Sequence, residues 1–365
     1  MLSNTKKTKA SITLLLTLSF ILLTFHVPLA NATEDSWTTK EPMPTTRISL
    51  GVAVVERKIY AIGGYNGSYL STNEMYDPVT DTWVTKTPMP TPRSTFGTAV
   101  VENKIYVIGG TLGNQVETGV NEVYDPLTDT WENKTAMPTP RMGLDANVVN
   151  GKIYLIGGGD AAGFIIYNFG ENEVYDPTTD TWTTKEPMAI PVHYYASAVL
   201  DNKIYIIGGG SGPSNHTQIY DAETNTWTSG TPIPTKVRGA VAGATTGVMA
   251  PKRIYVMGGE LFSENLNQVY NPETNKWITG NSMPIPRFVL SVAVVDDVLY
   301  AIGGYDGTNY SGVNEMYTPV GYIPEFPSWA ILPLLITATL VIIICRKRLA
   351  KTPSNFSKNG GKLIG

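Results

Sequence analysis

Four arginines recur at one position of a repeated pattern, and their chemistry is the recognition of acidic groups. Each lies 16 residues before a Gly-Gly pair and ends a proline-rich turn such as residues 88–93. A guanidinium group binds a carboxylate through two parallel hydrogen bonds, so a row of them favours an acidic peptide or an acidic sugar. The candidate residues of this basic arc are Arg47, Arg93, Arg141 and Arg287.

The same repeats carry glutamates that give the arginines a second explanation. Two repeats have Val192 and Val237 in place of arginine, and these two have Gln218 and Gln268 in place of glutamate. Arginine and glutamate are thus present or absent together, which is typical of ion pairs built into a fold, because a lost partner leaves a buried charge. The sequence leaves both the binding arc and the internal pairs open. The glutamates are Glu74, Glu122, Glu173 and Glu315.

Aromatic residues after the glycine pairs are a second set of candidate ligand contacts. The segments that follow the six pairs contain 9, 11, 14, 8, 8 and 10 residues, and such variable loops on a rigid scaffold commonly carry recognition. Aromatic rings stack on sugars or anchor a protein partner, although they can also fold back on their own scaffold. We select Tyr65, Tyr167, Phe262 and Tyr305.

The residue inventory argues against catalysis and cofactors. Cys345 is the only cysteine, so a disulfide or a thiolate zinc site is excluded, and His193 and His216 are the only histidines beyond residue 32. Acidic loop residues such as Asp160, Glu260 and Asp306 belong to no recognisable motif. We predict no catalytic residue, no metal site and no cofactor.

The charge distribution argues against nucleic acid as a partner. Of 27 basic residues, three lie in residues 1–32 and six in residues 346–365, which leaves 18 against 31 acidic residues and a formal charge of −13. Nucleic-acid binding needs clustered lysine and arginine to neutralise phosphates.

The repeats that position these residues are four-stranded units. The glycine pairs begin at residues 63, 109, 157, 208, 258 and 303, and spacings of 45 to 51 residues are typical of propeller blades. The first unit has strands at 51–55, 58–62 and 74–76 and a fourth from Trp83, with a two-residue turn at 56–57. The segments that enter the first strand and leave the second share one face of the ring, here the loop face. The two-residue turns occupy the opposite turn face.

Tryptophan positions predict how the ring closes. A tryptophan follows the first five glycine pairs by about 20 residues, at positions 83, 131, 182, 227 and 277, but none follows the sixth. The missing one is Trp37, near the start of the chain. We therefore expect an N-terminal strand to complete the last blade as its outermost strand.

The series IYAIGG, IYVIGG, IYLIGG, IYIIGG, IYVMGG and LYAIGG, each followed by Tyr and in five repeats by Trp, resembles the Kelch family. The resemblance covers residues 36–320 and implies an all-β, six-bladed Kelch propeller. In Kelch domains that bind acidic peptides, arginines at such positions point into the central pocket. Kelch rings act as peptide adaptors, glycan binders and occasional enzymes, and some epimerise sialic acid.

The ends of the chain predict export and anchoring. We expect a signal peptide at 1–32, the propeller at 33–320, a linker at 321–328, a transmembrane helix at 329–345 and a basic cytoplasmic tail at 346–365. Residues 324–328 resemble the PEF-type sorting signals of archaeal surface proteins, but a single-pass membrane anchor is favoured because the tail is longer than those signals usually carry.

These observations predict a binding or adhesion module on the extracellular face of the membrane. Its partner would be a surface protein or an acidic glycan, bound at the loop face. Two alternatives stay open, an enzyme acting on acidic sugars and an architectural envelope protein.

Overall fold

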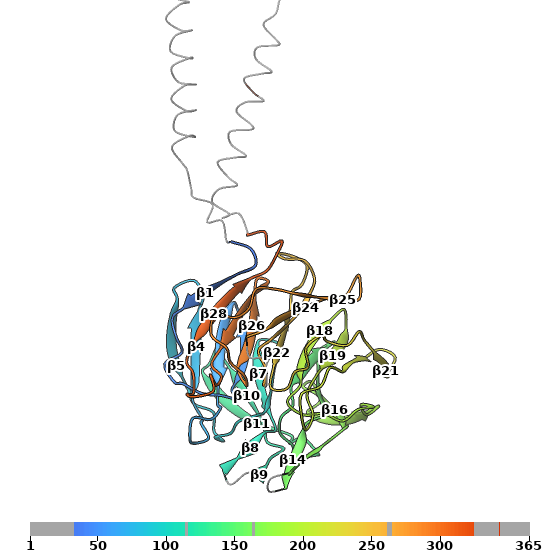
Figure 1. Cartoon of the computed structure of the whole chain (residues 1–365). Coiled ribbons are helices and arrows are strands. Elements are labelled where there is room, and N and C mark those ends of the chain that lie inside the picture. Colours follow the sequence, from blue (N-terminus) through green and yellow to red (C-terminus); the bar gives the residue numbers. More distant parts are fainter. Residues whose placement is uncertain (1–32, 114–115, 163–164, 261–264, 325–342, 344–365) are drawn as a thin grey trace, which may run out of the picture. The chain divides into compact units, whose positions relative to one another are not determined.

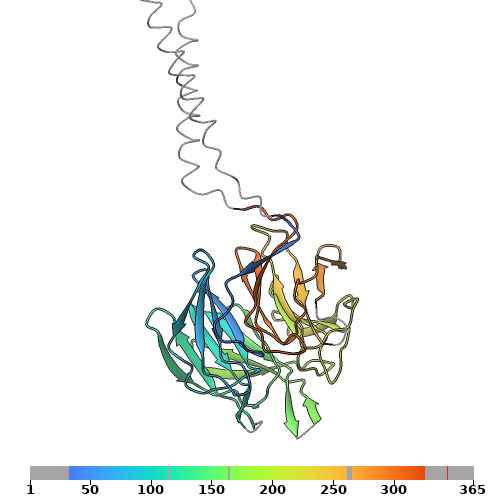
Figure 2. The same cartoon turned by 60° about the vertical axis from the view of Figure 1, so that its left-hand side comes forward.

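Six four-stranded antiparallel sheets surround one axis and form a propeller (Figures 1 and 2). The structure is a computed structural model and describes residues 33–113, 116–162, 165–260, 265–324 and 343. The all-β, six-bladed architecture expected from the sequence is confirmed.

The first three blades each use four consecutive long strands, running from the axis outwards. Blade 1 consists of β2 (Gly51–Val55), β3 (Lys58–Ile62), β4 (Asn73–Asp77) and β5 (Thr82–Lys86). Blade 2 consists of β6 (Gly97–Val101), β7 (Lys104–Ile108), β10 (Asn121–Asp125) and β11 (Thr130–Lys134). Blade 3 consists of β12 (Ala146–Val149), β13 (Lys152–Ile156), β16 (Asn172–Asp176) and β17 (Thr181–Lys185).

The last three blades follow the same order, except that the outermost strand of blade 6 comes from the other end of the chain. Blade 4 consists of β18 (Ala196–Leu200), β19 (Lys203–Ile207), β20 (Thr217–Asp221) and β21 (Thr226–Ser229). Blade 5 consists of β22 (Val241–Ala244), β23 (Ile254–Met257), β24 (Asn267–Asn271) and β25 (Lys276–Thr279). Blade 6 consists of β26 (Ser291–Val295), β27 (Val298–Ile302), β28 (Asn314–Thr318) and β1 (Ser36–Lys40).

The clasp predicted around Trp37 is confirmed. Strand β1 pairs antiparallel with β28, and Trp37 lies opposite Tyr317 in the register. The Tyr317 hydroxyl donates to Asp35 Oδ1 at 2.7 Å, and the same oxygen accepts the Asn281 amide of blade 5 at 2.8 Å. The N-terminal segment therefore fastens blade 6 to blade 5 as well as completing it.

The same fastening recurs at seams between blades whose strands are consecutive in sequence. Between blades 1 and 2, Asp129 accepts both the Tyr124 hydroxyl and the Thr87 amide, and the Trp131 indole donates to the Thr87 carbonyl at 2.9 Å. The apolar core also lies between blades, where residues of adjacent sheets such as Ile59 and Ala293 pack in one cluster. The repeated Tyr and Trp residues are thus inter-blade packing residues, as the spacing predicts.

A closed ring of backbone hydrogen bonds joins all six blades at the axis. One residue per blade donates its amide to the carbonyl of the equivalent residue in the preceding blade, over distances of 2.8 to 3.0 Å. All six residues have positive φ, between 45° and 65°, although four of them are not glycine. The ring consists of Ser49, Thr95, Gly143, Tyr194, Gly239 and Val289.

The two-residue turns lie on the turn face as predicted, and both residues of each have positive φ, as at Glu56 and Arg57. Two additional hairpins, absent from the sequence-based prediction, extend the loop face. They are β8 (Thr111–Leu112) with β9 (Val116–Glu117) and β14 (Gly159–Ala162) with β15 (Ile165–Asn168). These hairpins belong to the two longest loops, after the second and third glycine pairs, and lie at the end of the propeller away from β1 (Figure 1).

The compact unit that contains the propeller closes at Tyr322. Within the described ranges no helix is both long enough and apolar enough to cross a bilayer. The predicted signal peptide and, apart from Ile343, the predicted transmembrane segment at 329–345 lie outside the described residues, as do the tail and most of the sorting motif.

The clasp predicts that a single carboxylate controls ring closure. Replacing Asp35 with alanine leaves the Tyr317 hydroxyl and the Asn281 amide without their acceptor, so we expect the free energy of unfolding to fall by about 1–3 kcal/mol. Asp129→Ala at the seam between blades 1 and 2 is the matched control and should cost a similar amount. Urea unfolding of both variants tests this. An unchanged midpoint for Asp35→Ala beside a lowered one for Asp129→Ala would contradict the clasp.

Candidate functional site

The four arginines predicted to form a basic arc are fully buried inside their blades. Each has an exposed fraction of 0% and pairs with the glutamate of its own third strand. The pairs are Arg47–Glu74 (2.7 Å), Arg93–Glu122, Arg141–Glu173 and Arg287–Glu315 (2.6 Å).

Backbone contacts explain why arginine and glutamate occur together. Arg47 also donates to the carbonyls of Ala61 and Gly63, at 3.0 and 3.1 Å, so its guanidinium joins the second strand, the glycine pair and the glutamate. In blade 4, Gln218 exchanges two hydrogen bonds with the backbone of Ile190 instead, at 2.9 and 3.0 Å. A neutral amide thus replaces the ion pair where valine replaces arginine.

The basic arc is therefore corrected in favour of the internal pairs. The guanidinium groups present no surface to a ligand, and their terminal nitrogens donate to glutamate and backbone oxygens. Burial lowers the pKa of Arg47 to about 10 against the opposing effect of Glu74, so the guanidinium stays protonated at neutral pH. The arginines hold each blade together.

Two of the predicted aromatic residues belong to one cluster on the loop face. Tyr310 joins them, with its ring centroid 5.9 Å from both Tyr65 and Tyr305. Tyr69 packs edge-on to Tyr65 at 5.2 Å, and Phe288 packs edge-on to Tyr305 at 5.5 Å. These five rings, from blades 1 and 6, are called the aromatic cluster below.

The other two aromatic candidates are not part of this cluster as described. Tyr167 lies on the hairpin strand β15 and is 55% exposed. Phe262 lies outside the described residues.

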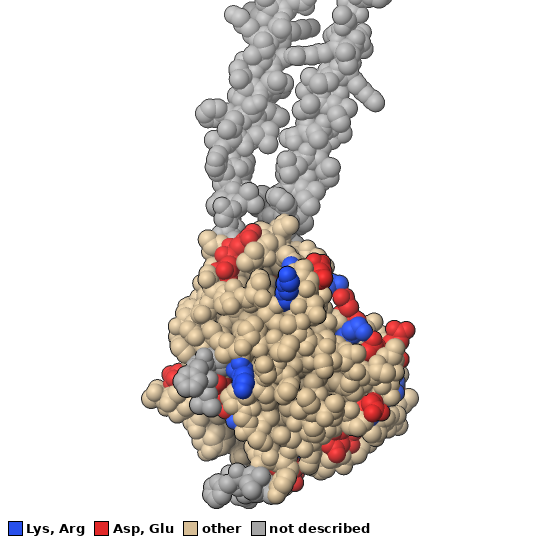
Figure 3. Space-filling view, turned by 45° about the vertical axis from the view of Figure 1, so that its right-hand side comes forward, with Lys and Arg blue, Asp and Glu red and all other residues tan. Residues whose placement is uncertain are grey.

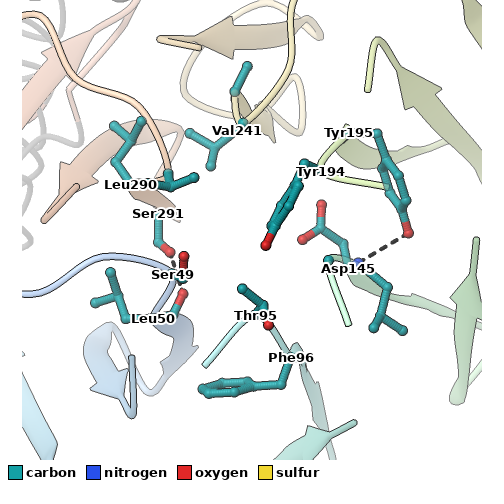
Figure 4. Close-up of a pocket in the computed structure, with 15 residues that line it drawn as sticks. Ser49, Leu50, Thr95, Phe96, Asp145, Tyr194, Tyr195, Val241, Leu290 and Ser291 are labelled. Carbon is teal, nitrogen blue, oxygen red and sulfur yellow. Dashed lines mark hydrogen bonds between the residues drawn. The ribbon is translucent and has the colours of Figure 1, made fainter. Parts of the chain in front are cut away.

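A cavity of about 430 Å³ opens above the hydrogen-bonded ring, between the aromatic cluster and Tyr194. Its walls include Tyr65 and Tyr69 on one side and Tyr194 on the other, with Ser49 and Thr95 of the ring below. Figure 4 shows the Tyr194 ring directed into the centre of the propeller. Burial raises the pKa of Tyr194 to about 12, so its hydroxyl remains a hydrogen-bond donor.

A polar cluster faces the aromatic cluster from blades 3 to 5. Arg238 lies 5.0 Å above the Tyr194 ring and pairs with Glu260 at 2.6 Å, and both side chains are about one-fifth exposed. One Arg238 nitrogen lies 3.3 Å from His193 Nε2, and His193 Nδ1 bonds Asn168 Oδ1. Burial, and then Arg238, lower the pKa of His193 to about 4, so the neutral ring donates from Nδ1 and accepts at Nε2.

Arg238 and His193 are not among the site residues predicted from the sequence, although the sequence contains a signal for them. In the two blades that lack the structural arginine, the residue immediately after the valine is His193 or Arg238. Successive residues of an extended segment point in opposite directions, so this position turns away from the blade that the valine faces. The equivalent residues Ile48 and Ser94 line the central cavity.

Acidic side chains complete the polar side. Burial raises the pKa of Glu117, and hydrogen bonding to Asp160 raises it further, while Glu117 Oε1 also accepts the Ala161 amide at 3.1 Å. Of the acidic residues considered from the sequence, Asp160 and Glu260 lie in this region. Asp306 instead accepts hydrogen bonds from the amides of Thr308 and Asn309 in its own turn.

Lysine and arginine are scattered singly over the face shown in Figure 3.

A second, narrower cavity continues from the ring into the propeller and contains one carboxylate. It measures about 90 Å³, and Figure 4 shows Asp145 pointing into it beside Tyr194. Ser197 Oγ donates to Asp145 Oδ2 at 3.0 Å, and the nearby Arg141 is committed to Glu173. Burial raises the pKa of Asp145 to about 6.

The buried pairs predict a strong effect of removing one partner. Arg93→Val leaves Glu122 buried without its cation, so we expect the free energy of unfolding to fall by about 3–5 kcal/mol. The double variant Arg93→Val/Glu122→Gln copies the residues of blades 4 and 5 and should recover most of that loss. Urea unfolding measures both. A single variant as stable as the wild type would show that the pair is not structural.

The Asp145 carboxyl predicts a stability change between pH 6 and 4. Its pKa is higher in the folded protein, about 6 against 3.8, so the ionised group destabilises the fold above pH 6 and protonation relieves this as the pH falls. In a buffer whose only cation is tetramethylammonium, Asp145→Asn should be more stable than wild type at pH 7.5 by roughly 1–3 kcal/mol. The difference should shrink towards zero at pH 4. Thermal melts at both values test this, and a pH-independent difference would contradict it.

Comparisons with known proteins agree with the architecture. The KLHDC2/KLHL20/DRC7 Kelch-repeats domain matches residues 22–209, and the Kelch motif matches residues 191–234, 246–284 and 287–333. The solved structure titled "Structure of YjhT" is similar with a TM-score of 0.65 and 18% identity, over 75% of this chain and 95% of that one, a likeness that concerns the fold alone. No curated protein matches the sequence. With more than half of its length matched by one family model and the repeats continuing beyond it, this chain belongs to the Kelch-repeat family.

Proposed function

We propose that the protein is a cell-surface binding module that takes a glycan of a surface partner at its loop face. The observation that supports this best is the cavity of about 430 Å³ between the aromatic cluster and Tyr194. The partly exposed tyrosine rings can stack on a sugar, and the Arg238–Glu260 pair with Asn168 offers donors and acceptors for its hydroxyl groups.

Burial of the four structural arginines changes the kind of glycan that fits. Arg238, which lies over the Tyr194 ring at the cavity, is partly exposed and is balanced by Glu260, and Glu117 and Asp160 add acidic groups nearby. A hydroxyl-rich ligand with little or no negative charge therefore suits the cavity better than a polyanionic one. A protein partner that inserts a polar loop uses the same contacts.

Export and anchoring are part of this proposal. Residues 1–32 have the composition of a signal peptide, and the apolar segment 329–345 is followed by basic residues. Strands β1 and β28 begin and end at the turn face, so the chain enters and leaves the propeller on the side opposite the cavity (Figure 1). The ends of the ring thus leave the loop face open for a ligand outside the cell.

A second candidate function is acid–base chemistry on an acidic sugar. The raised pKa of Glu117, next to Asp160, favours it, because a carboxyl that keeps its proton to a higher pH than usual is better suited to act as a general acid. Interconversion of N-acetylneuraminate anomers by the purified protein, lost in Glu117→Gln, would establish this activity. An architectural role would be favoured if neither binding nor turnover were found.

The binding proposal predicts that ligand affinity depends on the loop face alone. We expect a glycan array that includes neutral and acidic sugars, with acidic peptides beside them, to give hits that tolerate moderate salt. Arg238→Gln and Tyr65→Ala should each weaken the best hit at least tenfold, which corresponds to about 1.4 kcal/mol.

The matched control is Arg57→Gln, which removes an ion-paired arginine of the turn face. Arg57 pairs with Asp296 and lies on the side opposite the cavity, so its loss should leave affinity unchanged. Equal effects of Arg57→Gln and Arg238→Gln would argue against a loop-face site. Binding restricted to acidic ligands and abolished by salt would argue against the preference for weakly charged glycans.

A further inference from the structure

One blade places a carboxylate in the axial channel where the other five do not. Asp145 comes four residues after Arg141, at the entrance of β12. The equivalent positions carry small or apolar residues, so a charge here is a departure from the repeat and disfavours folding unless something offsets it. The equivalent residues are Gly51, Gly97, Ala196, Val241 and Ser291.

The hydrogen bonds around Asp145 leave a neighbouring oxygen without a donor. Ser197 Oγ lies 3.0 Å from Asp145 Oδ2 and 3.1 Å from the Asn147 amide, but a hydroxyl has one proton to donate. Both contacts are satisfied when Ser197 donates to Asp145 and the Asn147 NH₂ donates to Ser197, an amide orientation assigned from this network. The structure places Oδ1 of Asn147 toward Ser197 and leaves Nδ2 buried without a partner, so turning the amide to satisfy both contacts puts an oxygen at the unpartnered position.

A third oxygen comes from the neighbouring blade. Thr98 Oγ1 is buried and has no hydrogen-bond partner. Its side chain occupies the space beside Gly51, where an added Cβ would come within 2.0 Å of Oγ1, so blade 1 keeps a glycine at the place that the threonine fills.

These groups line one cavity of about 190 Å³ below the hydrogen-bonded ring. Asp145, Asn147, Thr98 and Ser197 all belong to its wall. Asn147 is only 5% exposed, so the oxygen assigned above is held inside the propeller and not at its surface. A space of this size admits a metal ion together with several water molecules.

We propose that this axial cavity is a binding site for a hydrated hard cation, Na⁺ or Ca²⁺, held by the carboxylate of Asp145 with the oxygens of Asn147 and Thr98. Hard cations prefer carboxylate, carbonyl and hydroxyl oxygens, and waters complete their coordination. The cation supplies the positive charge that no side chain in the described part of the chain provides to Asp145. The cavity shares Asp145 with the space at the level of Tyr194, which gives a path from the loop face. The site does not depend on the glycan proposal.

The test uses the full chain exchanged into tetramethylammonium buffer at pH 7.5, followed by thermal melts with added NaCl, CaCl₂ or MgCl₂ at matched ionic strength. We expect Na⁺ or Ca²⁺ to raise the melting temperature by at least about 2 °C, with a dependence on concentration that saturates. A response to sodium alone or to calcium alone identifies the ion. Isothermal titration calorimetry with the responding ion then measures one site per chain.

Three variants decide whether the axial cavity is responsible. Asp145→Asn should abolish the melting shift and the calorimetric signal, and Thr98→Val, which keeps the side-chain shape, should weaken binding severalfold. Asp160→Asn, which removes an exposed carboxylate of the loop face, is the matched control and should respond as wild type does. A shift of equal size in Asp145→Asn, or none of the three salts stabilising the wild type, would overturn the proposal.

Discussion

The closed ring of six backbone hydrogen bonds at the axis is the constraint on which the arrangement of this propeller depends. Each bond links one blade to the next, so no blade can tilt or slide without breaking bonds on both sides. The ring requires a left-handed conformation at every member, which is unfavourable for Val289 and Thr95 because both are β-branched. The hydrogen bonds on both sides of each ring member hold its backbone in that conformation. Closure of the ring thereby fixes where each inner strand starts. Every side chain of the cavity is placed relative to this ring.

The ring also separates structural positions from functional ones by a single residue. The side chain of the residue two positions before each ring member enters the blade. At this position Arg93 pairs with Glu122, and Val192 is buried in the blade that has Gln218. The next residue points to the loop face, and the residues after the ring member line the channel. Arginine two residues before the ring therefore supports the blade, whereas Arg238, one residue before it, pairs with Glu260 and lies over the Tyr194 ring. A shift of one position exchanges the two roles because an extended chain alternates its side chains.

Most of the architecture could be predicted from the sequence because the same residue pattern recurs in every blade. Six glycine pairs, the two-residue turns and the displaced Trp37 predicted the blades and their closure, and β1 pairs with β28 as expected. The covariation of Arg93 with Glu122 contained the correct explanation of the arginines, but spacing alone could not decide whether their side chains enter the blade or the pocket. That choice depends on which way the chain turns at the ring, and the spacing does not record it. The hairpins β8–β9 and β14–β15 were missed because loop length was the only signal for them.

Departures from the repeat are where this molecule differs chemically from a symmetrical ring. Blades 4 and 5 give up the buried ion pair, and the same two segments supply His193 and Arg238 to the loop face. Blade 3 alone introduces a carboxylate into the channel, at the one seam where Ser197 can donate to it. Because a repeat that only had to fold would keep all six units alike, these substitutions indicate demands beyond stability. Stability comes from what the blades share, and the polar and charged groups available to a ligand lie at the positions where blades 3, 4 and 5 depart from it.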